Sequence, residues 1–408
     1  MDRLSLRPLR SPAVALCLAA AGCGPADPAP GSESGRGPTE DPAEQSGDTG
    51  TTGQLPSGGN PATLGVANWL REGPGVPGWA HGHDLTAWAV PGGAHVFAAA
   101  WQGTDRLYST GASGITEIWA DATARASHGV ARGDLDGDGT TDVAVAVKHG
   151  ESGAWLLGGD APVWRPLPGA AGAKAVAVGD VDGDGRSDVV LGIQGANRLY
   201  RQTDDGFELR WTAERRLESD SVQLADLDGD GRPELLVGNS SGDGQPNQVF
   251  AFVDGAPQLR WTSPEDHMTN QIRACDLDGD GAAEFIEANS MAPNRIRRWT
   301  AGEAETVWQD HNAVEVVGVA CADGDGDGDL DLAFASPAGG WIVWNDAGTW
   351  TPGGRFGEAV APEAVEWIDV DGDTRPDLIV AQQGEPWVRW WTNAGRPAPQ
   401  GAAGTPNQ

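Results

Sequence analysis

The sequence predicts an all-β fold, a seven-bladed β-propeller of four-stranded blades that an N-terminal strand closes. Three observations predict it. A nine-residue acidic motif occurs six times, at spacings of 46, 46, 50, 47 and 46 residues. Short β-like apolar runs flank every copy, and a tryptophan recurs late in each period. The 60 glycines and 28 prolines indicate many turns, while 39% hydrophobic residues are too many for a disordered chain.

Each period contains four β-like runs. One apolar run precedes the acidic motif and another follows it, as in 175–178 and 189–191. A third run follows a gap rich in glycine and asparagine, as in 197–200, and a fourth contains a tryptophan. Four strands per period make a propeller blade, so the acidic motif is expected to join the first two strands. The tryptophans of the fourth runs are Trp119, Trp164, Trp211, Trp261, Trp308 and Trp350.

The two ends of the repeat array predict a closed ring. One period before Asp134, residues 87–100 have strand character but none of the acids, so we expect a further blade without a metal site. The last period ends after Trp391 without a fourth strand, whereas Trp69 lies upstream at the position where a fourth strand should end. An N-terminal strand is therefore expected to complete the last blade. The propeller is expected over 63–396, followed by a disordered tail at 397–408.

The acidic motif has the composition of a calcium loop. Carboxylates stand at positions 1, 3, 5 and 9, and glycine stands at position 4 and usually at position 6. Such a loop gathers several anionic oxygens around one point, which suits Ca²⁺ with its roughly six to eight oxygen ligands. Zinc and copper would prefer His or Cys. Carboxylates held this close repel one another without a cation, so calcium, about five or six ions, is expected to be part of the fold.

The predicted ligands follow the chain as six acidic loops, numbered first to sixth, with position 7 contributing its backbone carbonyl. They are Asp134, Asp136, Asp138, Thr140 and Asp142; Asp180, Asp182, Asp184, Arg186 and Asp188; Asp226, Asp228, Asp230, Arg232 and Glu234; Asp276, Asp278, Asp280, Ala282 and Glu284; Asp323, Asp325, Asp327, Asp329 and Asp331; and Asp369, Asp371, Asp373, Arg375 and Asp377.

Two other interpretations of the loops are weaker. An EF-hand requires a bidentate glutamate at its twelfth position, where this chain has Val145, Leu191 or Val237 inside apolar strands. A turn without metal needs one or two Asp or Gly residues, not four carboxylates repeated six times.

The loops and their strands resemble the VCBS/FG-GAP repeats, which also form the propeller of integrin α-subunits. In that family Asp-x-Asp-Gly-Asp-Gly-x-x-Asp binds calcium between the first two strands of a blade, and the resemblance implies this role for the acids above. It covers about residues 63–396. Thr374 replaces the second glycine of the sixth loop, which is expected to bind weakly, and Glu234 and Glu284 replace the closing aspartate. The Phe-Gly and Gly-Ala-Pro signatures are absent, so the bacterial branch is the closer comparison.

Residues 1–22 resemble a bacterial lipoprotein signal peptide. Three arginines within the first ten residues precede an apolar run at 13–21, and small residues precede Cys23, which the resemblance implies is lipidated. Ala20 stands where leucine is usual, which leaves ordinary secretion as an alternative. We expect an outer-membrane or surface lipoprotein of the bacterial cell envelope, or otherwise a periplasmic or secreted protein.

Residues 23–62 are rich in Gly, Pro, Ser and Thr and are expected to form a flexible tether. No other apolar stretch approaches the ~20 residues of a membrane span, so membrane attachment is expected through lipid alone. Cys275 and Cys321 could pair in an oxidising compartment. Their offsets within the repeat differ by one, which directs them to opposite strand faces, so we expect them to be unpaired.

The formal net charge of −32 disfavours a nucleic-acid partner, because phosphate binding needs clustered Lys and Arg. We expect a binding module, not an enzyme, with an extracellular protein or glycan on the face opposite the calcium loops. Two alternatives stay open: a calcium-dependent carbohydrate-active enzyme, either lyase or glycosidase, and a purely structural envelope protein. Convergent acids or a His/Tyr/Lys cluster in the central channel would favour the enzyme.

Two minor motifs carry little weight. Residues 238–242 match a hydrolase nucleophile pattern around Ser240, but a strand-to-helix elbow is not expected there. His81 and His83 could bind a transition metal, although no further ligand adjoins them. The connections expected on the opposite face are 213–220, 239–247, 263–270, 289–294 and 351–362.

Overall fold

The computed structural model describes residues 67–76, 82–242, 244–310, 314–357 and 361–396. The predicted signal peptide, tether, lipidated Cys23 and C-terminal tail lie outside these residues, as does His81. Every helix or strand assigned in them is a β-strand, which confirms the predicted all-β class. The described residues contain no helix long and apolar enough to cross a membrane.

The strands, in chain order, are β1 Leu70–Glu72, β2 Gly82–Val90, β3 Gly93–Ala100, β4 Arg106–Ser109, β5 Thr116–Ala120, β6 Ser127–Gly133, β7 Asp142–Val147, β8 Glu151–Leu156, β9 Val163–Ala171, β10 Ala173–Gly179, β11 Asp188–Gly195, β12 Arg198–Thr203, β13 Gly206–Thr212, β14 Leu217–Ala225, β15 Glu234–Asn239, β16 Gln245–Val253, β17 Ala256–Cys275, β18 Glu284–Ser290, β19 Arg295–Thr300, β20 Glu303–Gln309, β21 Gly318–Ala322, β22 Asp331–Ala335, β23 Gly340–Asp346, β24 Thr349–Phe356, β25 Pro362–Ile368, β26 Asp377–Gln382 and β27 Val388–Asn393.

The strands pair as antiparallel sheets. Four sheets have four strands each, in the orders β2-β3-β4-β5, β6-β7-β8-β9, β21-β22-β23-β24 and β1-β27-β26-β25. An 11-stranded sheet contains β10 to β20, because β11 pairs with β14 and the 20-residue β17 pairs with both β16 and β18. Divided at these two joins, the described strands form seven groups of four. Counted as one blade per group, the propeller has seven blades, and we propose this number.

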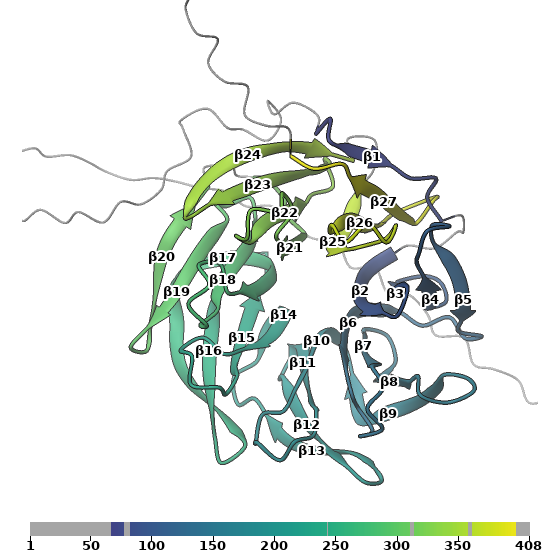
Figure 1. Cartoon of the computed structure of the whole chain (residues 1–408). Coiled ribbons are helices and arrows are strands. Elements are labelled where there is room, and N and C mark those ends of the chain that lie inside the picture. Colours follow the sequence, from purple (N-terminus) through teal and green to yellow (C-terminus); the bar gives the residue numbers. More distant parts are fainter. Residues whose placement is uncertain (1–66, 77–81, 243, 311–313, 358–360, 397–408) are drawn as a thin grey trace, which may run out of the picture. The chain divides into compact units, whose positions relative to one another are not determined.

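The groups are arranged around a common centre (Figure 1). The inner strands β2, β6, β10, β14, β17, β21 and β25 each pack against the next, and β25 packs against β2. The N-terminal β1 pairs with β27, from Leu70 opposite Asn393 to Glu72 opposite Trp391. The predicted closure by an N-terminal strand is therefore confirmed.

The second strand of each group lies in the core. All residues of β7 and β26 are buried, because a strand in the middle of a blade is covered on both faces by neighbouring blades. After the first residue, which is the last acid of an acidic loop, β7 is apolar throughout and β26 is apolar up to its last residue, Gln382.

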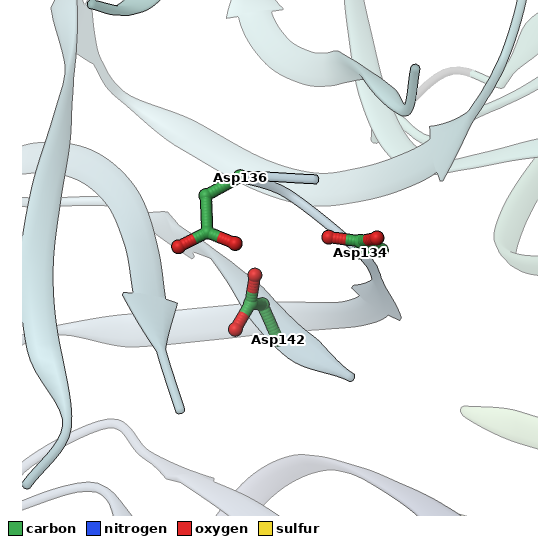
Figure 2. A group of neighbouring side chains, drawn as sticks. All are labelled: Asp134, Asp136 and Asp142. Atoms are coloured by element: carbon green, nitrogen blue, oxygen red, sulfur yellow. The ribbon is translucent and has the colours of Figure 1, made fainter. Parts of the chain in front are cut away.

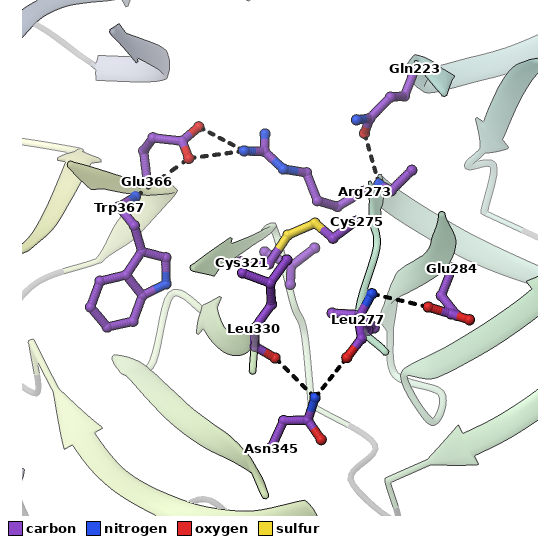
Figure 3. The surroundings of a disulfide bond; sticks show 12 residues. Gln223, Arg273, Cys275, Leu277, Glu284, Cys321, Leu330, Asn345, Glu366 and Trp367 are labelled. Atoms are coloured by element: carbon purple, nitrogen blue, oxygen red, sulfur yellow. Dashed lines mark hydrogen bonds and ion pairs between the residues drawn. A yellow bond between two sulfur atoms is a disulfide. The ribbon is translucent and has the colours of Figure 1, made fainter. Parts of the chain in front are cut away.

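Cys275 at the end of β17 forms a disulfide with Cys321 in β21, with a Cα–Cα distance of 6.8 Å (Figure 3). The expectation that these cysteines stay unpaired is wrong. It assumed that opposite strand faces point apart, but in a ring one face of each blade packs on the other face of its neighbour. Side chains on opposite faces of adjacent blades therefore meet, and both cysteines pack in the same apolar cluster as Leu330.

A buried polar residue before or within the third strand caps the end of the second strand in five of the groups. Asp105, Ser152, Asn197, Asn247 and Asn294 accept the backbone N–H of Ala100, Val147, Ile193, Asn239 and Asn289, respectively. Asn197 also donates to the Ser219 hydroxyl, whereas the equivalent Asp105 accepts a hydrogen bond of 2.9 Å from Ser127. The blade that uses a carboxyl instead of an amide thus places an ionisable group in the interior.

Asp105→Asn is expected to raise stability at pH values above about 6 and not in acid. Burial raises the pKa of Asp105 to about 6. A raised acid pKa adds stability that is complete below the unfolded pKa near 3.8 and is lost as pH rises through 6. The amide should therefore add on the order of 1–3 kcal/mol at pH 8 and almost nothing at pH 4. Thermal melts at both pH values test this, with the exposed Asp205→Asn as control; an equal shift at both would contradict it.

Candidate metal sites in the acidic loops

The six acidic loops lie between the first two strands of successive groups. They connect β6 to β7, β10 to β11, β14 to β15, β17 to β18, β21 to β22 and β25 to β26. The group that begins with β2 has a two-residue turn at the same place, Pro91 and Gly92, and carries none of the acids. The described loops thus all lie at the ends where the inner strands finish.

The first aspartate of each loop holds the backbone turn. Asp134 accepts the N–H of Gly137 at 2.7 Å and that of Gly139 at 3.0 Å. Both glycines have positive φ, 82° and 84°, a conformation that a Cβ disfavours. Thr374 adopts the same conformation with φ 74°, and its N–H still reaches Asp369 at 2.9 Å. The sixth loop therefore keeps the shared turn, and its weaker binding stays a prediction.

The last acid of each loop is buried and has a structural role that the sequence did not reveal. Asp142 accepts the N–H of Leu135 at 2.9 Å and that of Leu157 at 2.8 Å, which ties the loop to the end of the third strand. The second loop residue donates likewise to Asp188, Glu234, Glu284, Asp331 and Asp377. Burial, reinforced by Asp136 and Asp138, raises the pKa of Asp142 to about 6.

The carboxylates of a loop converge on one point. Asp134, Asp136 and Asp142 face a common space (Figure 2), and each offers an oxygen within 4.8 Å of the others. The same holds for Asp180, Asp182 and Asp188; Asp226, Asp228 and Asp230; Asp276, Asp278 and Glu284; and Asp323, Asp325 and Asp331. Positions 1 and 3 therefore meet in each of these groups, joined by position 9 in four of them and by position 5 in the third loop.

The donor set fits a hard cation. These groups consist of carboxylate oxygens, without His or Cys, and one or more members are exposed enough for an ion to approach. The neighbouring acids also raise the pKa of the buried Asp331 and Asp377, after burial itself, which shows that negative charge accumulates in the loops. Calcium is the common biological ion with this preference for several flexible oxygen ligands.

Arginines approach some of the loops, which the sequence did not predict. Arg201 on β12 contacts Asp182 at 3.0 Å and Asp184 at 2.5 Å. Similar ion pairs join Arg298 to Asp278 and Glu284, Arg396 to Asp325, and Arg375 to Asp373. In the described part of the chain, no Lys or Arg forms an ion pair with an acid of the first or third loop. Among the described residues, the acids of those two loops therefore have no basic side chain as an ion-pair partner.

The minor motifs lie elsewhere. Ser240 follows β15 and precedes β16, so the nucleophile pattern leads from strand to strand, and the N–H of Ser240 donates to Glu218 at 2.7 Å. His83 lies in the inner strand β2, where its ring is 3.6 Å from that of His128.

Comparisons with known proteins agree with this architecture. No curated protein sequence matches the chain significantly. The fold is similar to two crystal structures of BBS1N in complex with ARL6DN. The crystal soaked with lead gives a TM-score of 0.59 at 10% identity, and the crystal soaked with mercury gives 0.58 at 11%. Each match covers 82% of this chain and 99% of the matched chain. At these identities the likeness supports the propeller fold alone. The model of the FG-GAP-like repeat matches residues 134–191, 180–237, 226–287 and 323–380, more than half of the sequence. The chain belongs to the FG-GAP-like repeat family.

Proposed function

We propose that the chain is an exported calcium-binding propeller that serves as a binding module for a protein or glycan. The observation that carries the calcium assignment is the first acidic loop. Three of its four carboxylates converge within 4.8 Å, the most buried of them has a raised pKa, and no basic residue in the described chain pairs with them. Membership of the FG-GAP-like repeat family supports the same assignment.

Calcium in the first loop would be held by Asp134, Asp136 and Asp142 and would supply positive charge that offsets their repulsion. The protein supplies the frame. Asp134 fixes the turn through Gly137 and Gly139, and Asp142 ties the loop to the third strand. Because one such loop links two strands of a blade, bound ions would stiffen the face of the propeller on which the loops lie.

Calorimetric titration of the chelator-treated protein tests the assignment. We expect about five or six calcium ions to bind, and the double variant Asp136→Asn with Asp138→Asn to bind about one fewer. The matched control is Glu303→Gln with Glu305→Gln, two exposed acids at the same spacing on β20. The assignment fails if the loop variant keeps the full stoichiometry, or if the control loses an ion as well.

We also propose export and attachment by a lipid on Cys23, supported by the arginines, apolar run and small residues that precede this cysteine. Cys23→Ser should move the protein from the detergent phase to the aqueous phase in Triton X-114 partitioning of bacterial cells. Identical partitioning of variant and wild type would contradict lipidation and favour ordinary secretion.

Acids that meet in the central cavity are one of the features that would favour the enzyme alternative. The central cavity contains two neighbouring acids, Asp84 and Glu366, and burial raises the pKa of Asp84 to about 7. Each is held by protein donors: Asp84 accepts N–H groups of Leu85 and Val130 at 2.9 Å, and Glu366 accepts two hydrogen bonds from Arg273 and one from the backbone N–H of Trp367. Because donors of the protein already occupy these two carboxylates, the acids are suited to stabilising the channel. We therefore favour a binding module over a glycosidase or lyase.

A further inference from the structure

The inner strands surround a cavity of about 670 Å³. Six of these strands carry a one-residue bulge, near the start of the strand or, in β17, near the start of the part that pairs with β18. A bulge redirects the side chain that it displaces from the ladder. The bulged residues are His83, His128, Lys174, Asp220, Asn270 and Glu363, and all of them line the cavity. Because the acidic loops follow the last residues of the inner strands, this bulge ring lies at the opposite end of the channel.

Members of the bulge ring contact one another across neighbouring blades. A ring nitrogen of His128 lies 3.0 Å from the carbonyl oxygen of Lys174, and the Lys174 ammonium lies 2.5 Å from Asp220. Farther around the ring, Asn270 donates to the carbonyl of Val316 at 2.7 Å. These contacts indicate that the bulged residues lie at the same height along the channel. We call the ring that they form the mouth of the cavity.

Positive charge gathers on one side of this mouth. The chain has 408 residues and a net charge of −32, and its only lysines are Lys148 and Lys174. Lys148, in the β7–β8 connection, lies 5.0 Å from the ring centroid of Trp101, which is 5.7 Å from the ring of His128 and 5.5 Å from that of His149. His83, His128 and Lys174 line the cavity, whereas Lys148, Trp101 and His149 lie next to His128 but outside the lining.

The Lys148 ammonium has no carboxylate within ion-pair distance among the described residues, although Asp220, which pairs with Lys174, and Glu218 lie near enough to favour its charge. Burial, and then the charge of Lys174, lower the pKa of Lys148. Burial, then His83 and Lys174, lower the pKa of His128 to about 2, so its ring is neutral and can accept or donate a hydrogen bond. A partly desolvated ammonium without a carboxylate partner is satisfied best by an oxyanion from a ligand.

The other side of the mouth is polar and acidic. Asn270, Gln271, Glu315 and Glu363 line it, and such side chains accept and donate hydrogen bonds to hydroxyl groups. Deeper in the cavity the Arg273–Glu366 ion pair connects two inner strands that are not neighbours (Figure 3), three residues before the acidic loops begin. The room between the bulge ring and this pair suits a small polyhydroxylated molecule better than an extended chain.

We propose that this mouth binds an acidic sugar, with the sugar carboxylate at Lys148 and Lys174 and the hydroxyl groups at the amides and acids across the ring. The inference rests on the proposed role as a binding module, and it does not require that the acidic loops hold calcium.

Calorimetry of the full-length protein with glucuronate and with glucose tests the proposal, since these sugars differ only in the carboxylate. We expect glucuronate to bind with a dissociation constant of about 1 mM or below and glucose at least about tenfold more weakly. Lys148→Met should weaken glucuronate binding at least about tenfold. The control Arg215→Met removes an exposed cation from the β13–β14 connection and should leave glucuronate binding unchanged.

A second variant guards against misfolding. Lys174→Met combined with Asp220→Asn removes both partners of an ion pair, so that no buried charge is left unpaired, and should also weaken glucuronate binding. Asp136→Asn with Asp138→Asn should lose calcium yet bind glucuronate, which separates this proposal from the calcium assignment. The proposal is overturned if the folded wild type does not bind glucuronate, binds glucose or acetate equally well, or if both lysine variants bind like wild type.

Discussion

Chelation of calcium is expected to reduce the free energy of unfolding by up to about 8 kcal/mol, with a large fall in the melting temperature. The reason is mass action: an ion that binds only the folded state adds about 1.4 kcal/mol per site at a free concentration ten times its dissociation constant. Six equivalent loops give the upper figure. The first and third loops should contribute most, because no arginine neutralises their acids in the described chain.

The measurement is a series of thermal melts at increasing free calcium after treatment with a chelator. Sodium chloride at matched ionic strength is the control, since salt alone screens the repulsion among carboxylates. A rise that calcium produces and sodium does not would support ions as part of the fold. If the chelated protein melts at the same temperature as the calcium-loaded protein, the carboxylates act as turn residues only.

Trp69→Ala is expected to destabilise the protein by about 3–5 kcal/mol, the usual cost of removing a buried tryptophan. Trp69 is 5% exposed and packs 4.8 Å from the ring of Trp344. Its indole N–H donates to the carbonyl of Gly353 at 3.1 Å. The residue immediately precedes β1, which pairs with β27, so it joins the N-terminal segment to the last two blades. Its removal should therefore weaken the closure of the ring as well as the core.

Urea denaturation measures this loss, and Trp69→Phe should give a smaller one because it keeps an aromatic ring and loses only the hydrogen bond and part of the volume. The control is Trp119→Ala on β5, a partly exposed tryptophan that packs against Phe97 and Trp155 away from the closure. Were Trp69→Ala no more destabilising than the control, β1 would be dispensable for closing the ring.

The propeller class and the acidic loops could be predicted because their signals are local. Asp134 bonds to N–H groups three and five residues away, and glycines at fixed offsets provide the positive φ that the turn requires. The repeat length then sets the order of the strands, so the closing strand after Trp69 also followed from the sequence. The hydrogen bonds that Asp142 accepts from Leu135 and Leu157 were not predicted, because the motif marks Asp142 as a metal ligand and does not show what packs beside it.

The sequence by itself therefore determined the repeat, the strand order and the carboxylates of each loop, because these depend on neighbours within one blade. The tertiary structure decided which side chains meet between blades. Cys275 bonds to Cys321, 46 residues away, since opposite faces of adjacent blades pack together. Arg396 reaches Asp325, and Lys148 lies with Trp101 and His128, for the same reason. A fixed period shows which strands are neighbours. The contacts between blade faces, and between bulged residues, form only when the ring closes.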